Sequence, residues 1–269
     1  LRSAMVPKVR FLLPLVLVTG CTIGLSAEEP VSVGSPLAGH LVKGVSLPPQ
    51  GEGYVLLRPE EPTHFGTPSL VGLVQRVAAG VARRHPGGAP LVVGDLSARY
   101  GGAHPRHRTH RNGRDVDIFY PMLSLDGRSE GGRPYLHLGR FGAARGGEQG
   151  RLDLPRAFSL VELLLQDPET EVQWIFCERG LKARLLRYGV AVGADPEVLF
   201  RASWVLQQPT GAAPHDDHFH VRVFCSPRER ALGCEDRPPH WPWVEMKEDS
   251  ARPNEGDDQL LTWIGEGGL

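Results

Sequence analysis

Three histidines lie close together in one short segment of this chain. The segment HDDHFHVR, residues 215–222, contains His215, His218 and His220. If this segment forms a β-strand, His218 and His220 face the same side, because alternate side chains of a strand share a face. Imidazole nitrogens bind transition metals and transfer protons near neutral pH. The spacing therefore predicts metal chemistry, acid–base chemistry or both on one face of a strand.

A second stretch, about a hundred residues earlier, supplies the other donors. HRTHRNGRDVDIF, residues 107–119, places His110 before a tight turn at Gly113 and Asp117 on a predicted strand. Catalytic zinc takes three protein ligands and keeps one position for water. We expect His110, Asp117 and His220 to be these ligands. Because the set holds no thiolate, it favours a hydrolytic site over a closed structural one.

The remaining polar residues of the two stretches are given other roles. If His220 binds the metal, His218 lies beside it and is free to carry protons, and His215 either assists His218 or stabilises an oxyanion. Asp115 shares a strand face with Asp117 and is expected to pair with an arginine. Each piece also has an ordinary explanation, because an isolated H-x-H or D-x-D is common on a solvated strand. The combination of the two stretches is what favours a site.

These residues need a sheet to bring them together, and the sequence predicts several strands and helices. Apolar residues at helical spacing predict a helix over 69–85, with Thr67 or Ser69 as its cap. Further helices are expected from residue 154, capped by Asp153, and over 180–189, closed by Gly189. Strands are expected within 89–100, 114–120, 171–177 and 218–225. The class is α+β, a small antiparallel central sheet that carries the zinc site, flanked by helices and long loops such as 126–151.

Composition narrows the classes of protein. The 269 residues are 41% hydrophobic and 23% charged, which is ordinary for a globular protein. A net charge of -1 gives no reason to expect nucleic acid or an anionic membrane surface as a partner. Thirty-three glycines and twenty-four prolines favour short elements and loops over a helical bundle.

The first 27 residues resemble a targeting signal. Lys8 and Arg10 precede the apolar stretch FLLPLVLVTG, residues 11–20, which is short for a membrane span. The next residue is Cys21, after small side chains, so two alternatives stay open: a lipid anchor on Cys21, or secretory cleavage near Ala27. Either one predicts a periplasmic or cell-envelope location. Export also means an oxidising compartment, where disulfides form.

The other cysteines fit an exported protein. Cys225 and Cys234, nine residues apart across a turn-rich stretch, are expected to form a disulfide, worth about 2–3 kcal/mol by loop entropy. Cys177 is expected to be a buried free thiol.

At this point the chain resembles a known family. The pattern H-x-x-G-x-x-x-D followed far downstream by H-x-H resembles lysostaphin-type enzymes and D-Ala-D-Ala metallopeptidases. The finer resemblance is to the penicillin-insensitive murein endopeptidases, through GYVLLRP (53–59), HFGTPSLVGLVQRV (64–77), VVGDLS (92–97) and the two histidine stretches, in that order. It covers roughly residues 34–228. The chain departs from the family at His40, where a cysteine is expected, and in a glycine-rich loop at 131–150.

The resemblance implies an activity and a set of site residues. It implies hydrolysis of D-alanyl–diamino-acid amide cross-links of peptidoglycan, with His110, Asp117 and His220 on zinc and His218 and His215 in catalysis. His107 matches a histidine tied in the family to a second metal at a dimer contact, which implies a homodimer. The implied organisation is a signal at 1–27, a linker at 28–50, a zinc metallopeptidase domain at 51–228 and an acidic, Pro-rich extension at 229–269.

Two other functions stay open on the sequence. The first is a D,D-carboxypeptidase or dipeptidase of the same superfamily. Those enzymes usually carry an acidic base shortly before the last zinc histidine, and no E-x-x-H precedes His220 in that neighbourhood, so this alternative ranks second. The other is a non-catalytic, zinc-containing module that binds cell wall, which would be expected to have a degraded ligand set.

Overall fold

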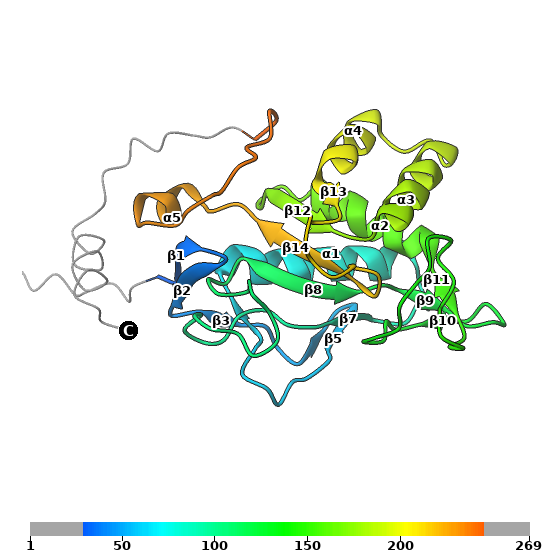
Figure 1. Ribbon diagram of the computed structural model, residues 1–269, viewed down its shortest axis with the longest axis horizontal. Helices are drawn as coiled ribbons and strands as arrows, with labels where there is room; N and C mark the ends of the chain where they lie inside the picture. The colour runs from blue at the N-terminus through cyan, green and yellow to red at the C-terminus, as the bar shows by residue number, and fades with distance from the viewer. Residues whose placement is uncertain (1–28, 245–269) are drawn as a thin grey trace, which may run out of the picture.

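A seven-stranded mixed sheet forms the centre of the computed structural model, which describes residues 29–244 (Figure 1). The predicted signal segment, Cys21 and a short helix expected at 257–264 lie outside the described residues. In order across the sheet, the strands are β13 (Leu206–Gln207), β12 (Val172–Phe176), β14 (His218–Val223), β8 (Asp115–Phe119), β7 (Leu91–Val93), β5 (Tyr54–Leu56) and β4 (Gln50–Gly51).

The α+β class is confirmed, but the prediction of a small antiparallel central sheet was wrong. The sheet has seven strands, and the pairs β12–β13 and β5–β7 are parallel. The additional strands at the edges are β13 and β4, each of two residues. Two residues are too few to show the period-two alternation that identifies a strand in sequence. The two edge strands could therefore not be predicted from the pattern of apolar and polar residues.

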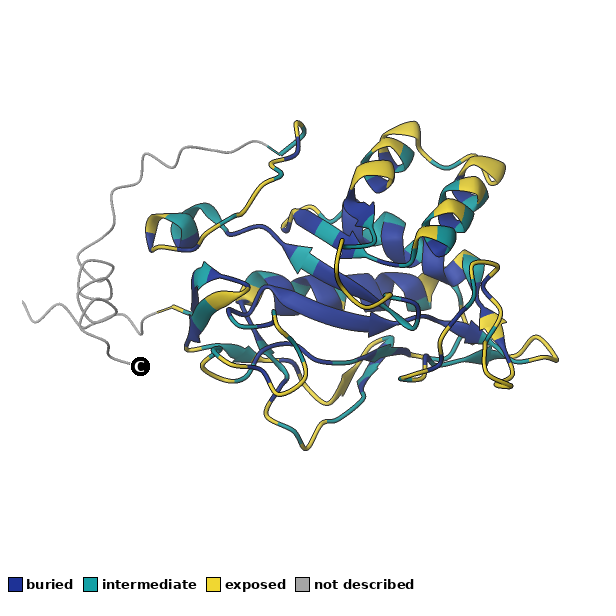
Figure 2. Cartoon of the chain, viewed as in Figure 1, coloured by how far each residue is buried: buried dark blue, intermediate teal, exposed yellow. Residues whose placement is uncertain are grey.

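Helices cover the face of the sheet that carries the apolar strand residues. α1 (Pro68–Arg84) runs behind the sheet in the view of Figure 1, and α2 (Leu154–Leu165) packs beside it. The Thr67 hydroxyl accepts a hydrogen bond from the Leu70 amide, and Asp153 caps α2 in the same way at Arg156. The inner sides of both helices are buried (Figure 2). Each large aliphatic side chain buried there is worth about 1.5–3 kcal/mol.

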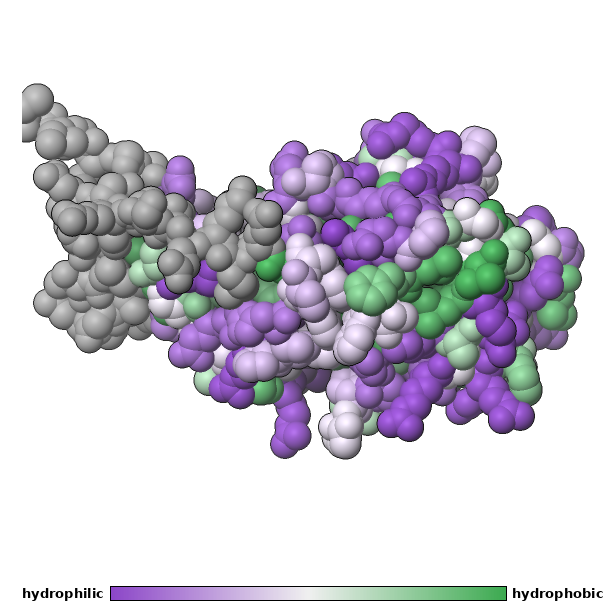
Figure 3. Space-filling view, turned by 90° about the horizontal axis from the view of Figure 1, so that it is seen from above, coloured by the Kyte–Doolittle hydropathy of each residue, from purple (hydrophilic) through white to green (hydrophobic). Residues whose placement is uncertain are grey.

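Two helices differ from the sequence expectation. α3 (Arg179–Ala191) continues past Gly189, which was expected to end it. The glycine instead allows close packing, since a Cβ there would lie 2.5 Å from ring carbons of Phe158. The helix that follows, α4 (Pro196–Val205), was not predicted, although Asp195 as cap and Pro196 as first residue are ordinary start signals. Figure 3 looks down on the molecule from the α3 and α4 side, where hydrophobic and hydrophilic side chains form separate patches.

Smaller sheets surround the main one. β1 (Val31–Ser35) pairs with β2 (Ala38–Val42), and β3 (Val45–Ser46) pairs with β6 (Phe65–Gly66). The long loop at 126–151 includes β10 (Ser129–Glu130) and β11 (Arg151–Leu152), which flank β9 (Met122–Leu123). No helix among residues 29–244 has the length and apolar character that a bilayer span requires.

The segment after β14 is tied back to the sheet. The predicted disulfide between Cys225 and Cys234 is confirmed, and it brackets the short helix α5 (Pro227–Ala231). Arg114, fully buried, forms an ion pair with Asp236 at 2.7 Å and donates a hydrogen bond to the Val223 carbonyl. Cys177 is a buried free thiol, as predicted, and burial raises its pKa to about 12.

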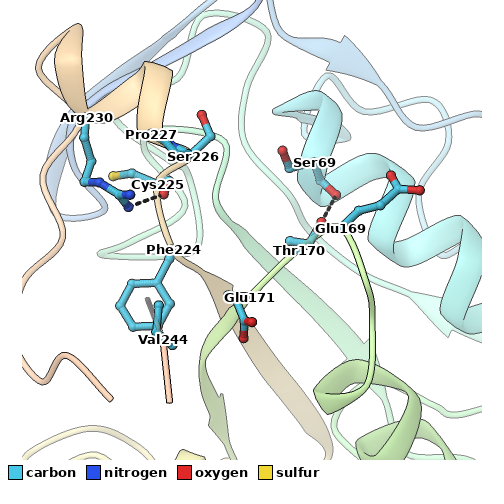
Figure 4. A pocket seen from close by; sticks show the side chains of 10 residues that line it. All are labelled: Ser69, Glu169, Thr170, Glu171, Phe224, Cys225, Ser226, Pro227, Arg230 and Val244. Atoms are coloured by element: carbon cyan, nitrogen blue, oxygen red, sulfur yellow. Dashed lines mark hydrogen bonds between the residues drawn. The ribbon is translucent and has the colours of Figure 1, made fainter. Parts of the chain in front are cut away.

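A small cavity of about 140 Å³ lies beside this segment (Figure 4). Its walls include Glu171, Phe224, Cys225 and Arg230. Phe224 and Cys225 follow the C-terminal end of β14, whereas His218 begins that strand. The cavity is therefore at the opposite end of β14 from the histidine cluster and is separate from the candidate site.

Candidate metal centre

Two neighbouring strands, β14 and β8, place the predicted site residues opposite one another. Their antiparallel register pairs His220 with Asp117, and Arg222 with Asp115. The intervening residues, Val116 and Ile118 on β8 and Phe219 and Val221 on β14, belong to the hydrophobic core. Alternation along the strands thus sends apolar side chains to the helices and the ionisable ones to the other face.

His110 reaches this face from the turn before β8. Its backbone has φ +62°, an uncommon conformation for a residue with a Cβ, and the turn is completed by Gly113 at φ +78°. The His110 amide donates to a carboxylate oxygen of Asp115, and its Nδ1 lies 3.1 Å from the Leu96 carbonyl. Because a carbonyl can only accept, Nδ1 carries a proton, and Nε2 is the ring atom that faces Asp117.

Three buried donor atoms form a triangle. His110 Nε2 and His220 Nδ1 are 3.3 Å apart, and each lies 3.3 Å from Asp117 Oδ1. The three residues are at most 4% exposed. Within the described part of the chain, Asp117 Oδ1 has no hydrogen-bond partner. A buried, unpaired carboxylate oxygen is costly unless a cation binds it, so the donor set fits a metal ion.

The ionisable groups on this face of the sheet shift one another's pKa values. Burial opposes ionisation of Asp117, but His110 and His218 outweigh it and hold its pKa well below the usual range. Burial likewise works against a charged His218, yet Asp117 and Asp217 raise its pKa to about 9. Burial, with the nearby His220 and His218, lowers the pKa of His215 to about 3. The face therefore pairs an ionised Asp117 with His218 and keeps His215 neutral.

Asp115 lies beneath the triangle and has little capacity left for a metal. Its oxygens accept from Arg222 Nε at 2.6 Å and Nη2 at 3.0 Å, and from the His110 amide at 3.0 Å. His220 Nε2 lies 3.6 Å from Asp115 Oδ1, which leaves Nδ1 turned toward the triangle. The expected arginine partner of Asp115 is thus Arg222.

Replacing Asp115 by asparagine is expected to weaken metal binding by about 10–100-fold, the usual cost of losing a partner that orients a metal ligand. The reason is the loss of the negative charge that faces both Arg222 and His220 Nε2. Competition with a chromophoric chelator measures the affinity. Asp126→Asn, an exposed carboxylate at a remote turn, is the matched control, and equal affinities in both variants would remove Asp115 from this role.

His218 is held by a residue that the sequence analysis did not single out. Its Nδ1 lies 2.5 Å from Asp217 Oδ1, and its Nε2 lies 3.5 Å from Asp117 Oδ1. The other oxygen of Asp217 accepts from the amide of Tyr135, which lies in the long loop. The signal that could have identified Asp217 is a carboxylate directly before His218 in the chain.

His215 lies beside His218 and His220. Its amide donates to Gln208, its carbonyl accepts from the Tyr120 hydroxyl at 2.7 Å, and its ring lies 5.3 Å from that of His218. The His215 Nδ1 atom is buried without a partner among residues 29–244. Phe176 on β12, also missed in sequence, closes one side, with its ring 5.3 Å from that of His220.

His107 lies at the edge of the triangle. Its Nε2 is 3.3 Å from Asp117 Oδ2 and 2.9 Å from Asp95 Oδ2. Three groups of side chains are close enough to hold a metal ion among the described residues. They are Asp95 with His104 and His107; His107 with His110 and Asp117; and His110 with Asp115 and His220. Asp95, however, is already paired with Arg106 through two bonds of 2.8 and 2.6 Å. That guanidinium opposes a second cation at Asp95, so the role of His107 stays a prediction.

Comparison with known proteins agrees with this geometry. The family model for penicillin-insensitive murein endopeptidase matches residues 32–251. Curated proteins of that name from Escherichia coli (strain K12 / DH10B) and Shigella boydii serotype 18 are each 32% identical over 212 residues, 77% of this chain and 70% of theirs. The resemblance predicted from the two histidine stretches is confirmed, and the chain belongs to the penicillin-insensitive murein endopeptidase family of peptidases.

Proposed function

We propose that this protein is a zinc-dependent murein endopeptidase that hydrolyses D-alanyl–diamino-acid amide cross-links in peptidoglycan. Membership of the family supports the reaction class. The triangle of His110, Asp117 and His220 supports the metal.

The observation that best supports zinc is the distance between the three donor atoms of that triangle. Zinc binds nitrogen and oxygen ligands at about 2.0–2.1 Å, and the corners of a tetrahedron of that radius are about 3.3–3.4 Å apart. The observed separations of 3.3 Å match this value. Calcium would need six to eight oxygen ligands at about 2.3–2.6 Å, which two imidazoles and one carboxylate do not supply.

The residues around the triangle provide the rest of the chemistry. A bound zinc ion would supply an acidic water and polarise the scissile carbonyl. His218, with Nδ1 held by Asp217, presents Nε2 on the metal side. A cation on Asp117 would offset the negative charge that raises the pKa of His218, so that Nε2 could take a proton from water and return it to the leaving amine. His215, neutral and with a free Nδ1, offers a hydrogen bond to the developing oxyanion. Phe176 packs against the rings of His215 and His220 on the β12 side.

Digestion of purified, cross-linked muropeptide dimers tests this proposal. Conversion of dimers to monomers, lost with a chelator and restored by zinc, is the expected result. Release of free D-alanine without monomers would instead indicate the carboxypeptidase alternative. Binding of sacculi without any cleavage would indicate the non-catalytic module.

We also propose that the protein acts in the periplasm or cell envelope. The residues at 1–27 support this through their signal-like pattern, and the disulfide between Cys225 and Cys234 suits an oxidising compartment. Fractionation of wild type and Cys21→Ser separates the two forms of export. Loss of membrane association in the variant would support the lipid anchor, and a soluble wild type beginning near residue 28 would contradict it.

A further inference from the structure

The long loop and the start of α3 bring three arginines together beside the catalytic histidines. We propose that Arg140, Arg145 and Arg184 form an anion-binding rim that takes a free carboxylate of the substrate's stem peptide. The inference rests on the proposed function and adds a substrate-recognition site to it.

Close backbone packing sets the positions of Arg140 and Arg184. A Cβ added to Gly180 would lie 2.4 Å from Arg140 Cβ, so the loop at residue 140 packs directly on the first turn of α3. One turn further along α3, the Arg184 side chain lies across Gly142, where a Cβ would be 3.3 Å from its Nε. The loop and the helix therefore present both arginines on one continuous surface.

This surface borders the segment that holds the catalytic histidines. The Leu138 amide donates to the Asp216 carbonyl at 2.8 Å, and Arg145 Nη1 lies 3.9 Å from Asp216 Oδ2. On the α3 side, the Glu178 amide donates to the His215 carbonyl at 2.9 Å. The segments that carry the rim thus contact His215 and Asp216 from two directions, just before His218 in the chain.

The positive charge of the rim is largely uncompensated. Three carboxylates lie nearby, and all are already engaged. Asp216 lies 2.7 Å from His137 Nδ1, Asp217 pairs with His218 and the Tyr135 amide, and Glu178 accepts from the α3 amides of Gly180 and Leu181. Within residues 29–244, neither Arg140 nor Arg184 has a carboxylate partner, and Arg184 Nε is buried without any hydrogen bond. For a chain of net charge -1, this is a local excess of positive charge.

A carboxylate is the occupant that best fits these groups. Guanidinium groups bind carboxylates through paired, charge-assisted hydrogen bonds, and such bonds are about twice as strong as neutral ones. A cross-linked stem peptide carries free carboxylates at its ends and on its diamino acid, close to the bond to be cut. A carboxylate bound at the rim would fix the peptide beside His218 without taking part in the chemistry.

The test compares muropeptide dimers with free and with amidated carboxylates. For the double variant Arg140→Gln/Arg184→Gln, we expect KM for the free-acid dimer to rise on the order of tenfold or more, with kcat and bound zinc unchanged. The amidated dimer should already show the high KM in the wild type and lose nothing further in the variant. Arg128→Gln, which removes an arginine paired with Asp126 at an exposed turn, is the matched control.

The outcomes separate this inference from the proposed function. If the wild-type protein releases no monomers, both the proposed function and the proposed role of the rim are contradicted. A wild type that cleaves the dimers, with equal KM in the double variant, would overturn the rim alone. Equal losses on free-acid and amidated dimers would also overturn it, since they would reflect altered structure. The single variant Arg140→Gln, at an exposed position, guards against a folding defect and should raise KM for the free-acid dimer only.

Discussion

Replacement of His220 by alanine should leave a protein that retains neither zinc nor activity. The side chain provides one of the three donor atoms that lie 3.3 Å apart, and its removal leaves only His110 and Asp117. Two ligands do not hold zinc against competing chelators, and every later step needs the metal. Metal analysis of purified protein should fall from about one equivalent per chain to a small fraction of that.

The matched control for His220→Ala is His85→Ala. His85 also lies in the described structure, but it contacts Ser159 and is remote from the triangle. It should keep both zinc and activity. Asp117→Ala should behave like His220→Ala, and stoichiometric zinc in either variant would remove that residue from the ligand set.

His218→Ala should show the second large effect, with a different signature. The three proposed ligands remain, so zinc should stay bound. The rate should fall on the order of a hundredfold or more, because the proton carrier is lost. The residual rate would come from polarisation of water and carbonyl by the metal. Parallel zinc analysis and steady-state kinetics on muropeptide dimers measure both quantities.

The pair of variants at 218 and 220 can also contradict the assignment. If His218→Ala empties the metal site while His220→Ala keeps it filled, the two roles must be exchanged. His220 Nδ1 faces His110 Nε2 at 3.3 Å, whereas His218 Nδ1 lies against Asp217 and only its Nε2 is turned toward Asp117. A loss of zinc in both variants would add His218 to the ligands.

The sequence predicted the structure best where the spacing of apolar residues and the types of the polar residues indicated the same element. The helix at 69–85 had an apolar stripe and a cap in Thr67, and it appears as Pro68–Arg84. The strand at 114–120 had alternating Asp and apolar residues, and the same alternation separates the donor face from the core. Alternate residues of a strand share a face, so the sequence was enough to predict that Asp117 and His220 belong to one cluster.

The parts that could not be predicted depend on contacts between distant segments. Asp217 acquires its role only because the loop at Tyr135 folds back and donates an amide to it. The rim of Arg140 and Arg184 needs the loop to pack on Gly180, a contact with no local signature. The two-residue strands β4 and β13 exist because neighbouring strands provide hydrogen-bond partners, and their own sequence carries no alternation.

The buried pair of Arg114 and Asp236 sets a limit on how far the chain can be shortened. Arg114 immediately precedes Asp115, which binds Arg222 and the His110 amide, so the pair supports β8, the strand that carries Asp115 and Asp117. A fragment that stops at Arg228 would lack both Cys234 and Asp236 and would leave the guanidinium of Arg114 buried without its carboxylate. Breaking a buried ion pair in this way costs about 3–5 kcal/mol, a large share of the roughly 5–15 kcal/mol that holds a domain folded. For recombinant production, the shortest stable form of this enzyme should therefore retain the chain at least through Asp236.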